Sequence, residues 1–323
     1  MVGVGVKGTV TVDWGDGSAP DTLTGTSTSK MVQTPIHEYA KPGDYVITLS
    51  GGAIGILGDL NFASYLVFGT VNNYRRALTY TDSIKRVEAG GNVTNLGSYA
   101  FYKCHSLASV YLSDGLTSTG ACAFQECYSL TSVHIPDSVT KLGNYAFKDC
   151  YTLASLDIPD SVTTFGFYTF QNCKSLASVR IPDGVTSIEG NVFIGCSTLA
   201  SVHIPEGLTS IGNGAFEACY ALASVHIPEG VTSIGNNAFY YCSALASVHI
   251  PGSVTSIGSN VFYCVSGAAY FDFSRHTAVP TLANSNAFTS ISTDCQIRVP
   301  AALVDEWKAA TNWSAYASYI VGV

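Results

Sequence analysis

The sequence has few charged residues: they make up 12% of its 323 residues, and only 15 are lysine or arginine. The basic residues are scattered and the formal net charge is −8 at pH 7, so the clustered cations that bind phosphates are missing and we expect no nucleic-acid binding. No apolar run reaches the roughly 18 residues of a membrane-spanning helix. Residues 1–6 lack the basic start and long apolar core of a signal peptide, so we expect no export signal in this chain.

The ten cysteines lack the C-x-x-C spacing that is typical of zinc sites. Seven of them recur at a fixed interval, which favours the role of a small buried hydrophobic residue. These seven are Cys104, Cys127, Cys150, Cys173, Cys196, Cys219 and Cys242. Cys122, Cys264 and Cys295 lie outside this column, and these three are the candidates for oxidation.

What the chain does have is a repeat of 23 residues, which keeps its phase from residue 77 to 260. Such fixed-period similarity indicates a solenoid, in which each unit buries its apolar face against its neighbours. Constant columns should therefore face inward. The phenylalanine column holds Phe101, Phe124, Phe147, Phe170, Phe193, Phe216, Phe239 and Phe262.

The unit at residues 215–237 predicts how one coil is built. Val225 and Ile227 alternate with polar residues, as in a short strand with one buried face. Pro228 ends this strand because it has no N–H to donate. Val231 and Ile234 then supply a second inward side.

The unit pattern A-F-x-x-C-x-x-L-x-S-V-x-I-P-x-x-V-T-S-I-G-x-x resembles the BspA-like leucine-rich repeat, over about residues 77 to 300. The resemblance implies an extracellular or cell-surface bacterial protein, often adhesive, whose ligands are usually proteins. It implies no catalytic residues and no cofactor, so we expect no enzyme.

The first part of the chain lacks the 23-residue repeat and instead has the pattern of strands joined by turns. Residues 10–14 and 45–49 are expected to be strands, and the turn at 41–44 precedes the second. The motifs VDWGDGS, HEY at 37–39 and PGDYVITLSG are similar to PKD-like domains of cell-surface proteins. This resemblance implies a small immunoglobulin-type β-sandwich.

The last part leaves the repeat after residue 262. Residues 271–273 and 296–300 still have the pattern of strands, and residues 301–310 carry apolar side chains at helical spacing. Trp307 and Trp313 are expected to cover the open end of the core.

The predicted fold is mostly β. A leucine-rich-repeat solenoid of short parallel strands in a right-handed coil is preceded by the small sandwich and closed by a cap with one helix. The expected domains are the PKD-like sandwich and join at 1–76, the repeats at 77–264, and a degenerate repeat with the C-terminal cap at 265–323.

One outward position of the strands varies in chemistry while its neighbours stay constant, and we call it the strand-face column. Solenoids place recognition on such variable positions of a constant scaffold, so this column is the expected ligand-binding surface. Its members are Tyr111, His134, Asp157, Arg180, His203, His226 and His249. The alternative is an ordinary solvated strand face.

Three consecutive imidazoles, those of His203, His226 and His249, are weak candidates for a metal site or for a surface that gains charge below pH ~6.5. No carboxylate is expected to complete a metal site, and parallel rings converge poorly. An acidic residue follows six of these seven strand segments; this acidic stripe holds Asp114, Asp137, Asp160, Asp183, Glu206 and Glu229. A serine, histidine and aspartate can be drawn together at Ser132, His134 and Asp157, but no oxyanion hole or strained nucleophile turn accompanies them.

The expected function is protein binding or adhesion at a cell surface, with an extracellular or host-surface protein as the partner. One alternative is a structural or receptor-contacting part of a larger assembly, such as a phage tail or surface layer. A second alternative is metal binding on the histidine column.

Overall fold

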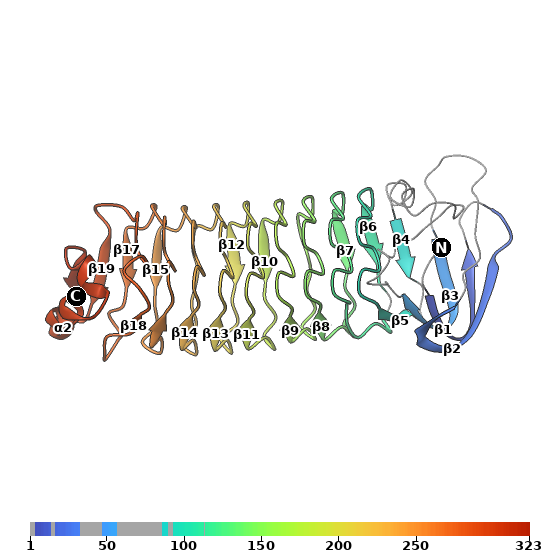
Figure 1. Cartoon of the computed structure of the whole chain (residues 1–323), viewed down its shortest axis with the longest axis horizontal. Helices are drawn as coiled ribbons and strands as arrows, with labels where there is room; N and C mark the ends of the chain where they lie inside the picture. Colours follow the sequence, from blue (N-terminus) through green and yellow to red (C-terminus); the bar gives the residue numbers. More distant parts are fainter. Residues whose placement is uncertain (1–3, 14–16, 33–46, 57–85, 90–92, 113) are drawn as a thin grey trace. The chain divides into compact units, whose positions relative to one another are not determined.

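The computed structural model of the chain describes residues 4–13, 17–32, 47–56, 86–89, 93–112 and 114–323 (Figure 1). The chain divides into two compact units, residues 1–173 and 174–323. Both are largely built from stacked coils with short parallel strands, so the chain is a mostly-β solenoid.

In the first unit, β4 (Arg86–Ala89), β6 (Ser109–Tyr111) and β7 (Ser132–His134) pair in parallel. Their register places Arg86 beside Ser109 and Ser109 beside Ser132, so each step along the ladder is one 23-residue repeat. A second parallel pair joins β8 (Lys141–Leu142) to β9 (Thr164–Phe165).

The start of the first unit is an antiparallel group of three strands, β1 (Val4–Asp13), β2 (Asp21–Val32) and β3 (Ile47–Ile56). β3 also pairs in parallel with β4 and with β5 (Val93–Leu96). These strands and the first coils therefore share one seven-stranded sheet, ordered β2-β1-β3-β4-β6-β7 with β5 on β3.

The predicted sandwich is not confirmed, because the described residues of this part form one sheet and not two facing sheets. The physical reason is that the edge of β3 pairs with β4 through backbone hydrogen bonds. The strands of the repeats therefore extend the same sheet and do not form a second sheet facing it. The strands expected at 10–14 and 45–49 overlap β1 and β3. The turn at 41–44 and the start of the repeats at residue 77 lie outside the described residues, and the predicted domain boundaries stay predictions.

The coils of the second unit are also joined by parallel pairing of short strands. β11 (Ser187–Ile188), β13 (Ser210–Ile211), β14 (Ser233–Ile234), β16 (Ser256–Ile257) and β18 (Thr281–Leu282) form a five-stranded parallel sheet. On another side of the coils, β10 (Ser178–Arg180) pairs with β12 (Ser201–His203). That side continues with β15 (Ser247–His249), β17 (Tyr270–Asp272), β19 (Gln296–Val299) and β20 (Ile320–Gly322).

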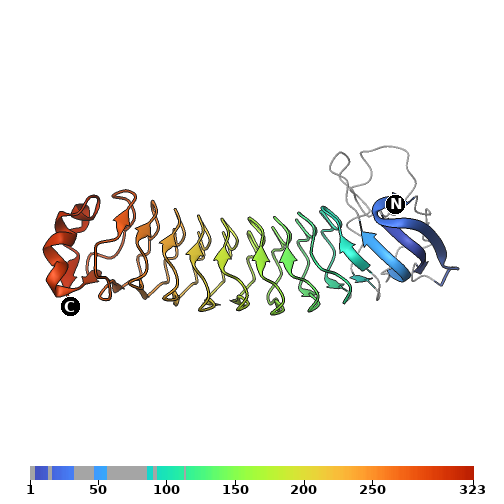
Figure 2. The same cartoon turned by 90° about the horizontal axis from the view of Figure 1, so that it is seen from below.

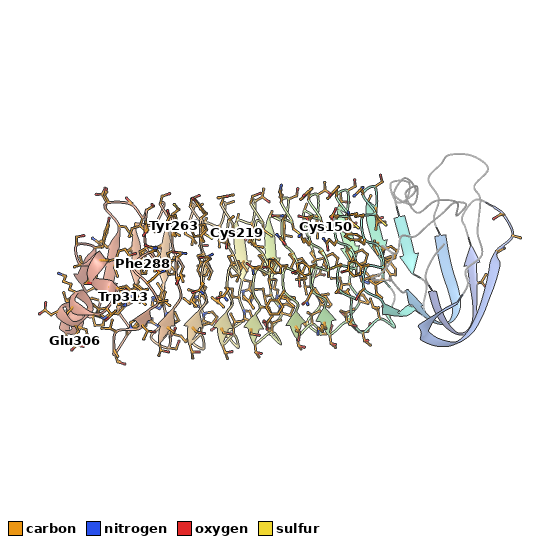
Figure 3. The ribbon with its side chains drawn as sticks, in the orientation of Figure 1. Cys150, Cys219, Tyr263, Phe288, Glu306 and Trp313 are labelled. Carbon is orange, nitrogen blue, oxygen red and sulfur yellow. The ribbon has the colours of Figure 1, made fainter. Side chains whose placement is uncertain are left out.

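The interior of each unit holds the predicted constant columns. Phe101 stacks on Phe124 with ring centroids 5.2 Å apart, and Phe216 stacks on Phe239 at 5.5 Å. Val225 and Ile227 are buried, as predicted, and so are Val231 and Ile234 on the second inward side. The seven cysteines of the column are buried, and none of the ten cysteines, all of which lie in the described residues, forms a disulfide; Cys150 and Cys219 are labelled in Figure 3.

The C-terminal cap consists of η1 (Ala301–Leu303), α2 (Val304–Ala309), η2 (Trp313–Tyr316) and β20 (Figure 2). The helix expected over 301–310 is present, but its first turn is a 3₁₀ turn. Trp307 and Trp313 are fully buried, as predicted. Trp307 packs against Phe273 at 5.0 Å, so the cap closes the last aromatic layer of the second unit.

Candidate binding surface

The strand-face column lies on the outward side of the coils that carry it. In the first unit Tyr111 ends β6 and His134 ends β7, and both side chains are exposed. Their rings stack at 4.7 Å with an angle of 14° between planes. Asp157 is also exposed, although no strand is assigned to its segment.

In the second unit, Arg180 ends β10, His203 ends β12 and His249 ends β15. His226 forms an isolated parallel bridge with His249. Arg180, His203 and His226 are exposed, whereas His249 is half-buried. The parallel register therefore presents one side chain of this column on each coil.

The acidic stripe and the strand-face column are in contact in the second unit. Arg180 Nη2 lies 3.4 Å from Asp183 Oδ2. His226 Nε2 lies 3.3 Å from Oε1 of Glu206, which belongs to the preceding coil. The turn after the proline of one coil thus brings a glutamate beside the imidazole of the next coil, a contact that the sequence did not predict.

His249 lies between two carboxylates. Its Nδ1 is 3.1 Å from Asp272 Oδ2, and its Nε2 is 4.0 Å from Glu229 Oε1. Glu229 also accepts a hydrogen bond of 2.8 Å from Arg275 Nη1. Partial burial raises the pKa of Asp272, but hydrogen bonds from Ser274 and the contact with His249 outweigh it and hold this pKa below its usual range.

Asp272 and Arg275 were not predicted as part of this surface. The 23-residue spacing could have identified Asp272, which stands 23 residues after His249. The two residues pair in register, so the strand-face column continues beyond the part of the sequence where the repeat is recognisable. Arg275 follows in the turn and has no counterpart at this position in the earlier coils.

The histidine column does not form a metal site in this part of the molecule. Among the described residues, no group of three or more histidine, cysteine, aspartate or glutamate side chains is arranged to hold a metal ion. His226 instead faces Glu206, and His249 faces Asp272 and Glu229.

The charged side chains of this surface can bind a partner by replacing their internal ion pairs with ion pairs to the partner. Exposed ion pairs contribute little to stability, typically about 0–1 kcal/mol, because water and salt compete with them. The same side chains can therefore reorient toward a partner at small cost, and their different chemistry on each coil gives the surface a specific pattern. These properties suit a recognition surface.

Comparison with known proteins places the chain in a family. The family model described as "BspA type Leucine rich repeat region (6 copies)" matches residues 73–200 and 163–293. No curated protein matches the chain. Among the described residues, no helix has the length and apolar composition to cross a membrane.

Several solved structures resemble the chain. A leucine-rich repeat protein from Eubacterium ventriosum is 21% identical with a TM-score of 0.50, and the match covers 79% of this chain and 73% of that one. A leucine-rich repeat protein from T. pallidum is 28% identical with a TM-score of 0.42, covering 57% of this chain and 77% of that one. A leucine rich cell surface protein from Faecalibacterium prausnitzii is 23% identical with a TM-score of 0.35, covering 72% and 82%.

The likeness to the Eubacterium ventriosum protein supports the fold, and the family model covers more than half of the chain, including the residues of the phenylalanine and cysteine columns. The chain therefore belongs to the family of BspA-type leucine-rich repeat proteins.

Proposed function

We propose that this chain binds a protein partner through the strand-face column, as a cell-surface or extracellular adhesion protein. The observation that carries the proposal is the contrast between two adjacent columns. The serine beside each member of the strand-face column is the same from coil to coil, whereas the member itself changes from aromatic to imidazole, carboxylate and guanidinium. A surface kept only for solubility needs no such variation.

The surface location is supported by the BspA-like resemblance, which implies proteins at the bacterial cell surface whose ligands are usually proteins. The open, charged strand face supports a macromolecular partner, since no cofactor or catalytic group is needed for its chemistry. Opposite charges on a partner would be steered to this face and would then replace the internal ion pairs.

A binding screen tests the proposal. The full chain is applied to immobilised extracellular-matrix and mucosal proteins, beside a variant in which Arg180, His203, His226 and His249 are all changed to Ser. A matched control changes the exposed threonines Thr186, Thr209, Thr232 and Thr255 to Ser, which alters as many coils on a different side.

We expect binding that is lost in the strand-face variant and kept in the threonine control. Equal loss in both variants would contradict a specific role for the strand face. Absence of binding by the unaltered chain to every protein in the screen would contradict adhesion and favour a role in a larger assembly.

A further inference from the structure

A second exposed surface of the second unit is rich in tyrosine. It lies on the turns at 213–221, 236–244 and 259–267, between the phenylalanine and leucine columns. We call its four rings, Tyr220, Tyr240, Tyr241 and Tyr263, the tyrosine cluster; Tyr263 is labelled in Figure 3. None of these side chains belongs to the strand-face column.

The rings of the cluster have two orientations. Tyr240 and Tyr263 stack on each other at 5.0 Å with 24° between planes. Tyr241 stands at 88° to Tyr240 and at 64° to Tyr263, so it contacts them edge to face. Tyr241 and Tyr220 are 39% and 50% exposed, which leaves much of their aromatic surface open to a partner.

The fold does not require tyrosine at these positions. Tyr241 has a φ of +61°, a left-handed conformation that costs a bulky residue about 1–2 kcal/mol. One and two coils earlier the same repeat position holds Ala218 and Gly195. The position of Tyr220 is occupied by serine in both adjacent coils, at Ser197 and Ser243. The left-handed backbone is a property of this repeat position, since Ala218 and Cys264 also have positive φ. The sign of a role outside folding is the exposed aromatic ring at positions where adjacent coils have small residues.

Elsewhere in this chain, three half-buried tyrosine rings lie beside cations. Arg298 lies over the ring of Tyr270 at 3.8 Å in the second unit. In the first unit, Lys103 lies over Tyr102 at 5.0 Å and Lys148 over Tyr145 at 5.7 Å. These are cation–π contacts, in which the negative face of the ring attracts the charge.

The turns of the tyrosine cluster contain no lysine or arginine, and their only charged residue is Glu217. Glu217 occupies the repeat position of Tyr240 one coil earlier, a step of about 5 Å along the stack. Its Oε2 accepts a hydrogen bond of 3.4 Å from Asn237, and partial burial raises its pKa. The cluster thus has the rings and a carboxylate, but its turns supply no cation of the kind that lies over Tyr102, Tyr145 and Tyr270.

We propose that the tyrosine cluster with Glu217 is a second protein-binding surface, and that its partner is a protein segment presenting lysine or arginine side chains. The partner's cations would lie over Tyr220 and Tyr241 as Lys103 lies over Tyr102, and one of them would pair with Glu217. Tyrosine is enriched at protein interfaces because its rigid ring gives a large contact area at low entropic cost. This surface is separate from the strand face and does not depend on the function proposed above.

The chain itself supplies the test variants. Tyr220→Ser and Tyr241→Ala introduce the residues that the neighbouring coils already have at the same positions, so the fold should accept them. Together they leave the net charge of −8 unchanged, and any nonspecific attraction of a basic probe to this acidic protein therefore stays the same. Glu217→Gln copies Gln171 at the corresponding position and removes only the carboxylate.

The probe is a fluorescent 12-residue peptide of alternating arginine and glycine, titrated with the full chain and followed by fluorescence anisotropy. We expect the double tyrosine variant to bind about tenfold more weakly, as two lost cation–π contacts imply, and Glu217→Gln to bind severalfold more weakly. A double variant of the serines at the same repeat position, Ser197→Ala with Ser243→Ala, should bind as the unaltered chain does.

Circular dichroism melting curves of each variant separate loss of binding from loss of folding. Equal peptide affinity for the unaltered chain and a folded double tyrosine variant would overturn the proposal. So would binding of neutral oligosaccharides at the cluster in place of the peptide, shown by a loss of sugar binding in the same variant.

Discussion

The thiol of Cys242 donates a hydrogen bond to the backbone carbonyl oxygen of Phe216, 3.1 Å away and 26 residues earlier in the sequence. Two invariant columns of the repeat are therefore bonded to each other between successive coils. The same bond joins Cys127 to Phe101, Cys150 to Phe124, Cys173 to Phe147 and Cys219 to Phe193. It explains why the column favours cysteine: the site is small and dry and has a carbonyl that accepts a weak donor.

These thiols should be unreactive in the folded protein. Burial raises the pKa of Cys127, Cys150 and Cys219 well above the usual range, so little reactive thiolate forms. Cys264 is only half-buried. With a thiol reagent at pH 8 we expect one fast-reacting cysteine, and Cys264→Ser should remove the fast phase. Rapid reaction of most of the ten thiols in the native protein would contradict the buried column.

Close stacking of the coils should make Gly235 intolerant of a side chain. A Cβ at Gly235 would lie 2.6 Å from the backbone nitrogen of Asn213, whereas a Cβ at Gly207 has its nearest neighbour at 3.7 Å. We expect Gly235→Ala to lower the free energy of unfolding by about 1–3 kcal/mol. Gly207→Ala is the control and should change it by less than about 0.5 kcal/mol. Urea unfolding measures both, and equal effects would argue against steric contact as the cause.

The cap should be a main source of stability for the second unit. Trp313 is fully buried, and its Nε1 donates a hydrogen bond of 2.9 Å to the carbonyl of Pro280. Trp313→Ala should cost about 3–5 kcal/mol, as for other large aromatic residues removed from a core. Val323→Ala, at a terminus that is 59% exposed, should have almost no effect. A Trp313→Ala variant with an unchanged unfolding midpoint would show that the last coil does not depend on the cap.

His276 should make stability depend on pH. Burial lowers its pKa, although its ring nitrogens lie 3.2 Å and 3.1 Å from the carbonyl oxygens of Phe273 and Val254, which oppose the shift. The unfolded chain therefore binds a proton more readily below pH ~6.5, so stability from neutral His276 is present above that pH and is lost below it.

We expect the urea midpoint of the unaltered chain to fall more between pH 7.5 and 5.5 than the midpoint of His276→Gln. The other titrating groups are shared by both proteins, so the difference isolates His276. A larger fall in the variant would mean that the two carbonyls hold the imidazole in its charged form.

The repeat allowed the interior to be predicted from the sequence. Phe216 and Cys219 have equivalents in most coils because the neighbours on both sides need the same shape, and this made the inward columns recognisable. The strand-face column was recognisable because its residue changes from coil to coil while the columns beside it stay constant. Trp307 and Trp313 were placed correctly because large apolar rings beyond the last repeat must cover its open face.

Other features could not be read from the pattern. The contact between His226 and Glu206 depends on the conformation of the turn after the proline, which sets the distance from Glu206 to the next coil. The spacing of residues along the sequence does not determine that distance. β2 was missed because its sequence, DTLTGTSTSKMV, is rich in serine and threonine and lacks a regular apolar face. The pairing of β3 with β4 was missed because edge pairing uses backbone groups that every sequence has.

The uniform 23-residue step also bears on how such a protein can change its length. Residues 201–207 read SVHIPEG and residues 224–230 repeat them, so recombination between these copies would remove or add one whole unit. The phenylalanine, cysteine and leucine columns would stay continuous after the exchange, because each position meets an equivalent one. Lineages could thus gain or lose single members of an outward column, and so alter the pattern offered to a partner, without redesigning the interior.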